Sequence, residues 1–194
     1  PKIRKYYDQL EENLVATLDT GETVTAANKL VVVTRLQQAT SGYAVNESGE
    51  IIANIGNHKE DALAEWLDGL PNDEPVVIFC KFRADIETAQ RVLDRLGRSH
   101  SELSGRKKSL DEWQRGDTIA LVVQQQAGGV GVDCTRACYA MYFSLSHSLG
   151  DFDQSLARLR RPGQKRPCRV YHLVAEATVD RAIYEALQAK RDVT

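Results

Sequence analysis

The sequence predicts an α/β fold, a mainly parallel sheet flanked by helices, preceded by a helical region. After residue 75, short apolar runs of strand length alternate with helical patterns, which is typical of right-handed crossovers and a parallel sheet. Before residue 71, hydrophobic residues recur every three or four positions, which indicates helices. The segment Pro-Asn-Asp-Glu-Pro at residues 71–75 separates the helical pattern from the alternating pattern. We therefore expect two domains, residues 1–70 and 71–194.

The first region is expected to contain three helices and two short β-like pieces. A hydrophobic stripe over residues 3–18 predicts the first helix, and the pattern from about residue 26 to 36 predicts the second. Two β-like pieces lie within residues 42–55, around a turn at 46–49. Asn57 is placed to cap a helix that runs to Leu70, and Glu60, three residues later, completes a capping box.

The second region is expected to hold four strands that alternate with helical patterns. The four strands are Val76–Cys80, Ile119–Val123, Ala137–Ser144 and Val170–Val174. Because these runs are apolar throughout, we expect every strand to be buried on both faces. The helical patterns lie at about residues 84–96, 107–115, 151–161 and 178–190.

Composition narrows the class of protein. With 194 residues, 42% hydrophobic and 27% charged residues, the chain is long and apolar enough for a globular core. No apolar run is long enough to cross a membrane, so we expect no membrane partner and a cytoplasmic location, or a nuclear one in a eukaryote. The four cysteines and four histidines lack metal-ligand spacing, so we expect no metal site and reduced, buried thiols. A first residue of Pro suggests a processed or shortened chain.

Two segments carry residues suited to phosphate chemistry. The loop after the second strand runs Gln-Gln-Gln-Ala-Gly-Gly-Val-Gly-Val-Asp over residues 124–133. Its glycines allow backbone amides to approach an anionic oxygen, although such a turn is more often only a tight connection. In the second segment, Arg158 and Arg161 are three residues apart, so on a helix they share a face. Pro162 and Gly163 are expected to end that helix, leaving two guanidinium groups near its end. A solvated basic face is the alternative.

Together these segments resemble the second RecA-like lobe of a superfamily-two helicase or translocase of the Swi/Snf-like branch. Residues 103–107, Leu-Ser-Gly-Arg-Lys, take the place of the family's "LDGST", and residues 124–133 that of "STRAGGxGxN". Residues 154–164 take the place of "QAxxRxxRxGQ", and residues 175–183 resemble "GTxEExI". The strand at 76–82 resembles the motif that opens the lobe. Before Pro75 the likeness is weaker and covers the helical region of this branch.

The resemblance implies a role for individual residues. Arg158 and Arg161 align with arginine fingers that reach the ATP phosphates, and such a finger is worth on the order of 10³–10⁵ in turnover. Nucleotide-side candidates are Gln154, Gly129, Gly131 and Asp133. Candidates for gripping the phosphate backbone of nucleic acid are Lys81, Gly105, Arg106, Lys107 and Gln125. The implied cofactors are ATP and Mg²⁺, bound in the intact enzyme with a first RecA-like lobe that is missing from this sequence. The implied partner is DNA, in duplex form.

The sequence also departs from the family pattern. Gln125 replaces a Ser or Thr, Arg106 and Lys107 replace the Ser-Thr pair, Arg160 replaces a common His and Asp133 a common Asn. No GxxxxGK[ST] motif occurs, and no Asp-Glu pair follows a strand. We therefore expect this chain alone not to hydrolyse ATP.

Two other functions are compatible with the same motifs. The chain could be a stand-alone nucleic-acid or partner-binding module that kept the lobe fold without motor activity, and such a module would bind DNA by itself. It could also be the lobe of an RNA helicase, which would prefer RNA to duplex DNA in a stimulation assay.

Overall fold

The computed structural model describes residues 2–19, 26–46, 48–127 and 132–192. The chain divides into two compact units. The first, called here the N-terminal unit, comprises residues 1–59 together with 175–182, and the second, called the sheet unit, comprises residues 60–174 and 183–194. The domain boundary at residues 70 and 71 stays a prediction.

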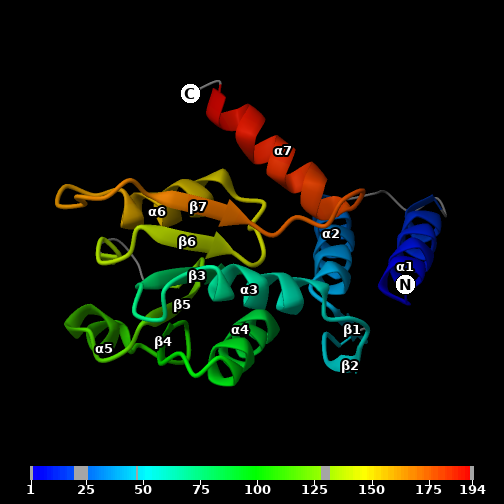
Figure 1. Ribbon diagram of the computed structural model, residues 1–194. Helices are drawn as coiled ribbons and strands as arrows, with labels where there is room; N and C mark the ends of the chain where they lie inside the picture. Colours follow the sequence, from blue (N-terminus) through cyan, green and yellow to red (C-terminus); the bar gives the residue numbers. More distant parts are fainter. Residues whose placement is uncertain (1, 20–25, 47, 128–131, 193–194) are drawn as a thin grey trace. The chain divides into compact units, whose positions relative to one another are not determined.

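A five-stranded parallel sheet organises the sheet unit (Figure 1). Its strand order is β4-β5-β3-β6-β7, so the first strand of the chain in this sheet lies at its centre. The α/β fold class predicted from the sequence is confirmed. The strands are β3 (Val76–Cys80), β4 (His100–Leu103), β5 (Ala120–Gln124), β6 (Tyr139–Tyr142) and β7 (Arg169–His172).

Helices cover both faces of the sheet, with α3 in front of the strands and α6 behind them in Figure 1. The helices of this unit are α3 (His58–Asp68), α4 (Arg83–Arg95), α5 (Leu110–Arg115), α6 (Leu149–Leu159) and α7 (Val179–Asp192), of which α3 and α7 begin in the N-terminal unit. One core cluster joins Leu67 of α3 and Val92 of α4 to Ile78 of β3. On the other face, Tyr142 lies 5.2 Å from Phe152 of α6, measured between ring centroids. Aromatic and aliphatic burial on both faces therefore stabilises the sheet.

Three details of the predicted elements are wrong. Strand β4 was not predicted, because Ser101 and Glu102 are polar; both are buried, and the Ser101 hydroxyl lies 2.8 Å from that of Thr118. Strand β7 is not buried on both faces, because it is last in the strand order, and Tyr171 is 40% exposed. Glu60 does not complete a capping box: its two carboxylate oxygens pair with Arg95 and Arg91 of α4.

The N-terminal unit contains α1 (Lys2–Asp19), α2 (Ala26–Thr40) and an antiparallel hairpin of β1 (Tyr43–Val45) and β2 (Ile51–Asn54). These elements match the helices and β-like pieces expected here. Gly42 adopts a φ of 98° between α2 and β1, and a Cβ there would lie 2.1 Å from the Gly56 carbonyl oxygen, so only glycine fits this turn. Across the described residues, no helix is long and apolar enough to span a membrane.

The start of α7 belongs to the N-terminal unit through a set of buried polar contacts. The Asp180 carboxylate lies 2.7 Å from the Lys59 ammonium, and both side chains are less than 10% exposed. Thr40 donates to the same carboxylate at 3.0 Å. The Tyr7 hydroxyl accepts from the Val179 N–H at 2.8 Å, and burial raises the pKa of Tyr7 to about 12. This cluster attaches residues 175–182 to the unit.

Candidate functional site

The arginine segment does not have the helical geometry expected from the sequence. Helix α6 ends at Leu159, and Arg160 takes the C-cap position with φ −96° and ψ 68°. Arg161 therefore lies beyond the helix, and the prediction that Arg158 and Arg161 share a helical face is wrong. Pro162 and Gly163 are not the residues that end helix α6, since the Arg160 backbone has already left helical geometry.

Arg158 and Arg161 nevertheless meet the same short segment. The Arg158 carbonyl accepts from the Cys134 N–H at 2.9 Å, and Arg161 Nη1 donates to the Val132 carbonyl at 3.2 Å. Val132 is the first described residue after the glycine loop. The two arginines are thus linked by the backbone segment that follows the glycine loop, and they do not share a helical face.

Gln164 strengthens this attachment. Its side-chain amide Nε2 donates to the Ala137 carbonyl at 2.8 Å and to the Thr135 carbonyl at 3.0 Å. Sequence reasoning assigned no role to Gln164, although it is the last residue of the motif. Its two donor hydrogens suit two carbonyl acceptors, which clamps the turn after Arg161 onto residues 135–137.

The two arginines differ in exposure. Arg158 is only 4% exposed, and its Nη2 donates to Gln154 Oε1 at 3.3 Å. Burial lowers the pKa of Arg158, but a guanidinium remains charged in proteins. Arg161 is half-buried, whereas the predicted nucleotide-side residue Gln154 is exposed.

Asp133 lies between Val132 and Cys134, the two residues that contact the arginine segment. Its side chain carries a negative charge. Its carboxylate Oδ1 accepts from the Thr135 N–H at 2.8 Å. The hydrogen bonds from Thr135, followed by the charge of Arg161, hold the pKa of Asp133 below its usual value, so the carboxylate is ionised at neutral pH. Gly129 and Gly131, the other two nucleotide-side candidates, lie outside the described residues.

The backbone-gripping candidates follow the carboxyl ends of three neighbouring strands. Lys81 follows β3, and its Nζ lies 5.0 Å from the Phe82 ring centroid. Gly105 and Lys107 follow β4 and are exposed. Parallel strands collect their carboxyl-terminal loops at one edge, where ligands of such sheets bind. The fold therefore places Lys81, Gly105 and Lys107 on the side of the sheet where the carboxyl ends of its strands lie.

Arg106 is already paired with acidic groups. Its Nε lies 2.8 Å from Glu102 Oε1, and its Nη1 lies 2.9 Å from Glu87 Oε1. The hydrogen bond from Arg106 is the main reason that the pKa of Glu87 is lowered. Two carboxylates thus balance this guanidinium locally, which weakens its attraction for a phosphate.

Gln125 is also engaged within the fold. The side chain is 1% exposed. Its Nε2 donates to the Ser144 carbonyl, and its Oε1 accepts from the Ser146 N–H, both at 2.7 Å. The amide therefore joins the β5 loop to the loop after β6, and both of its ends serve the backbone.

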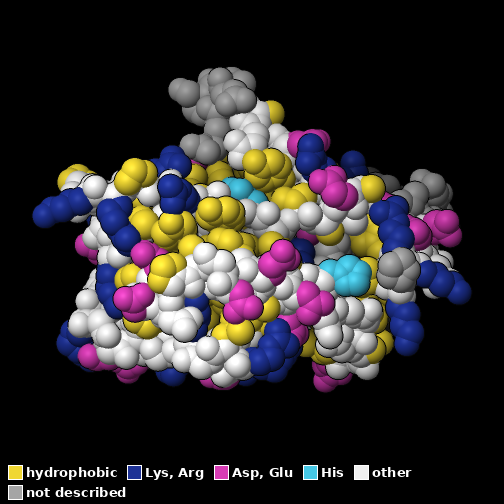
Figure 2. All heavy atoms as spheres, viewed as in Figure 1, with side chains coloured by type: hydrophobic (Ala, Val, Ile, Leu, Met, Phe, Trp, Pro, Cys, Tyr) yellow, Lys and Arg dark blue, Asp and Glu magenta, His cyan; other side chains and the backbone are white. Residues whose placement is uncertain are grey.

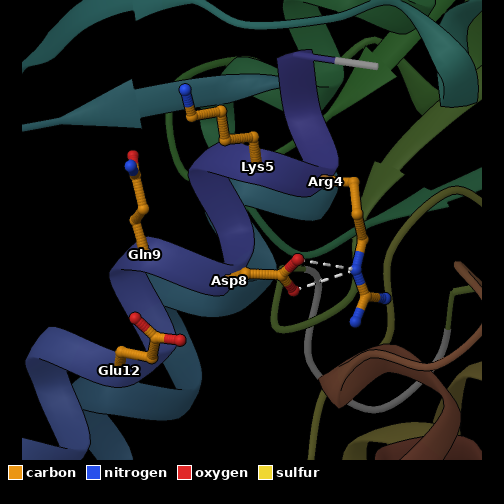
Figure 3. A pocket seen from close by; sticks show the side chains of 5 residues that line it. All are labelled: Arg4, Lys5, Asp8, Gln9 and Glu12. Atoms are coloured by element: carbon orange, nitrogen blue, oxygen red, sulfur yellow. Dashed lines mark hydrogen bonds and ion pairs between the residues drawn. The ribbon is translucent and has the colours of Figure 1, made fainter.

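Further features of the described residues include four free cysteines and a hollow along α1. No group of three or more His, Cys, Asp or Glu residues there could hold a metal ion. All four cysteines are free, and three of them are buried. A shallow hollow runs along one face of α1, lined by Arg4, Lys5, Asp8, Gln9 and Glu12 (Figure 3). Arg4 and Asp8 pair across it at 2.9 Å, so its charged groups are partly satisfied.

The family assignment follows from the comparison with protein-family models. Residues 58–163 match the model of the helicase conserved C-terminal domain, which is more than half of the chain. The chain belongs to this family. The DNA repair and recombination protein RDH54 of Saccharomyces cerevisiae S288c is 23% identical over 150 residues, covering 73% of this chain and 16% of that protein. Protein CHROMATIN REMODELING 19 of Arabidopsis thaliana is 26% identical over 167 residues, covering 80% of this chain and 22% of that protein.

Solved structures show the same fold in Swi/Snf-type proteins. The Sulfolobus solfataricus SWI2/SNF2 ATPase C-terminal domain matches 98% of this chain and 82% of its own, with a TM-score of 0.70 and 18% identity. The ATPase core of that organism in complex with dsDNA matches 100% of this chain and 42% of its own, with a TM-score of 0.71 and 19% identity. The resemblance to a Swi/Snf-like RecA-like lobe is confirmed. The chain spans less than a quarter of the length of the curated relatives named above.

Proposed function

We propose that this chain is the second motor lobe of an ATP-dependent DNA helicase or translocase. It supplies arginine fingers to ATP held by a first lobe and grips the phosphate backbone of duplex DNA. Closure of the two lobes on ATP brings the fingers to the phosphates, and reopening after hydrolysis moves this lobe along the backbone.

The observation that supports this proposal most is the attachment of the arginine segment to the residues that follow the glycine loop. Residues 158–164 form hydrogen bonds with the backbone at residues 132, 134, 135 and 137. These hydrogen bonds offer a physical connection between the two segments, and coupling between nucleotide and nucleic acid needs such a connection. The guanidinium groups and the Gln154 amide suit phosphate oxygens. ATP and Mg²⁺ themselves would be held by the first lobe, since this sequence contains no P-loop lysine.

The structure favours Arg161 over Arg158 as the principal finger. Arg161 is half-buried at the end of the segment, whereas Arg158 is 4% exposed and bonds to Gln154. Arg158 would contribute mainly by holding the segment, and it would reach a phosphate only after a rearrangement of its surroundings. Both remain candidates for contact with the nucleotide.

The test is Arg161→Ala in an enzyme that carries both lobes. We expect DNA-stimulated ATP turnover to fall on the order of 10³-fold or more, because a finger stabilises charge in the transition state. DNA affinity should stay within about threefold, since Arg161 is not among the phosphate-backbone residues, and threefold is less than 1 kcal/mol.

Arg160→Ala is the matched control, because Arg160 is the neighbouring exposed arginine and sits at the C-cap of α6. It should leave turnover close to that of the unmodified enzyme. Equal losses of turnover in the two variants would contradict a finger role. Equal losses of turnover and DNA affinity in Arg161→Ala would also contradict it. Tight, salt-dependent DNA binding by this chain without a first lobe would favour a stand-alone binding module instead.

A further inference from the structure

Two cysteines occupy equivalent positions at the amino ends of neighbouring strands. Cys138 directly precedes β6 and Cys168 directly precedes β7, and the first registered pair of these parallel strands is Tyr139 with Arg169. The Arg169 N–H donates to the Cys138 carbonyl at 2.7 Å, so the ladder extends to the cysteines. Neighbouring strands are about 4.8 Å apart, and disulfides form at Cα separations of about 4.4–6.8 Å.

The two side chains also leave the sheet on the same face. Tyr142 and His172 are a registered pair whose rings stack with centroids 4.9 Å apart. Cys138 and Cys168 each lie four residues before a member of that pair, and side chains four residues apart on a strand share a face. The Cys168 thiol lies 3.8 Å from the Leu159 carbonyl at the end of α6, which agrees with this placement.

We propose that Cys138 and Cys168 form a reversible disulfide, a thiol oxidation site that fastens the segment carrying Arg161 to the amino end of β6. The oxidant is a low-molecular-weight disulfide such as oxidised glutathione.

The surroundings of the pair suit this reaction. Cys168 is partly exposed, whereas Cys138 is 5% exposed, so Cys168 is the thiol that meets the oxidant first. Exposed Lys165, Arg166 and Arg169 surround Cys168 in the chain, and of these Arg166 is paired with Glu74. Figure 2 shows basic side chains gathered at the end of the molecule where β7 begins. Positive charge attracts an anionic disulfide such as oxidised glutathione.

The step proceeds in two exchanges. The Cys168 thiolate attacks one sulfur of oxidised glutathione, forming a mixed disulfide and releasing one glutathione thiolate, which takes up a proton. The Cys138 thiol then loses its proton and attacks the Cys168 sulfur, releasing the second glutathione. The proton passes to solvent, because Glu74 Oε1, which lies 3.8 Å from the Cys138 sulfur, is ion-paired with Arg166. Two protein thiols are oxidised, and one glutathione disulfide is reduced to two thiols.

The cross-link would restrict the arginine segment. Residues 160–167 would be closed between Leu159 at the end of α6 and the bridge at Cys168. Gln164 already clamps this segment to Ala137, the residue before Cys138. Oxidation therefore adds a covalent bond next to an existing noncovalent attachment, and reduction removes it.

The test is oxidation of the full chain in glutathione buffers of increasing oxidised-to-reduced ratio, followed by peptide mapping without reduction. We expect a peptide containing Cys138 linked to Cys168, formed within one molecule and lost when dithiothreitol is added. Cys138→Ser should instead stop at a glutathione adduct on Cys168. Cys168→Ser should lose the linked peptide, and Cys80→Ala, which removes a thiol that is fully buried in β3, should retain it.

Three results would overturn the proposal. One is a glutathione adduct on Cys168 that persists in the unmodified chain. The second is disulfides only between molecules. The third is a linked peptide that appears only in denaturant, which would mean that the folded register does not bring the thiols together.

Discussion

Breaking the buried ion pair between Lys59 and Asp180 should strongly destabilise the N-terminal unit. Loss of the Asp180 charge should cost more than loss of the Lys59 charge. The pair is 2.7 Å long with both side chains at most 6% exposed. The Lys59 ammonium has no hydrogen bond of good geometry there. Asp180, by contrast, also accepts from the Thr40 hydroxyl at 3.0 Å and from the Ala175 N–H at 3.4 Å. The ammonium thus depends on its partner more than the carboxylate does.

This asymmetry sets the expected magnitudes. Asp180→Asn leaves a buried, unpaired ammonium, and removal of one partner of a buried pair costs about 3–5 kcal/mol. Lys59→Met leaves a carboxylate that keeps two donors, so it should cost less, about 1–3 kcal/mol. The double variant removes both charges and should recover most of the loss caused by Asp180→Asn.

Urea unfolding of the chain measures these differences. With a slope of about 1–3 kcal/mol per molar urea, the Asp180→Asn loss lowers the midpoint by about 1 M or more. Circular dichroism at the helix band includes α1 and α2 of the N-terminal unit, whereas both tryptophans of the chain, Trp66 and Trp113, lie in the sheet unit. The two signals therefore report whether the loss is confined to one unit.

Asp8→Asn is the matched control. Asp8 pairs with Arg4 at 2.9 Å (Figure 3). Both side chains are more than 40% exposed, and exposed pairs contribute roughly 0–1 kcal/mol. An Asp180→Asn midpoint no lower than that of Asp8→Asn would refute the reasoning. A greater loss for Lys59→Met than for Asp180→Asn would refute the asymmetry.

Two further predictions concern the candidate backbone-gripping face. Lys107→Ala in the two-lobe enzyme should lower DNA affinity about equally for all sequences and reduce the slope of log affinity against log salt by about 1. Filter binding at several salt concentrations measures this slope. Lys165→Ala, on the side of the sheet where the amino ends of the strands lie, should leave the slope unchanged. Because the pKa of Glu87 is lowered in the folded chain, its pairing with Arg106 stabilises the fold at pH 7, and this stabilisation is lost as the pH falls below about 4.5 through the folded pKa. Arg106→Gln should therefore lower the urea midpoint at pH 7, and this loss should shrink as the pH is lowered through the folded pKa of Glu87. A loss that stays the same as Glu87 becomes protonated would contradict the pairing.

The sheet was predictable where hydrophobic burial alone forms a strand. Residues of β3 are uniformly apolar and fully buried, so the strand predicted from the apolar run has the same bounds as the observed one. Strand β4 was missed because Ser101 and Glu102 are buried with hydrogen-bonded polar side chains, and a polar strand has no hydrophobic period. The edge position of β7 depends on strand order, which hydrophobic pattern does not contain.

The site was predictable as a set of motifs but not as a geometry. The spacing of Arg158 and Arg161 predicted a shared helical face. The actual link is a hydrogen bond from the Cys134 N–H to the Arg158 carbonyl and one from the Arg161 side chain to the Val132 carbonyl. Nothing in the local pattern reveals that Gln125 is buried with both amide ends bonded, or that Arg106 lies between Glu87 and Glu102. Apart from the local pair Glu102–Arg106, those contacts join residues that only the folded sheet brings together.

The departures from the family pattern therefore differ in consequence. Gln125 stands where a hydroxyl is usual, but its amide spans two backbone groups of the loop after β6, so the substitution changes packing between loops. Arg106 introduces a cation, but Glu87 and Glu102 balance it. Lys107, the other replacement in the segment 103–107, is exposed. If this face binds phosphate as proposed, its positive charge therefore comes more from Lys81 and Lys107 than from Arg106.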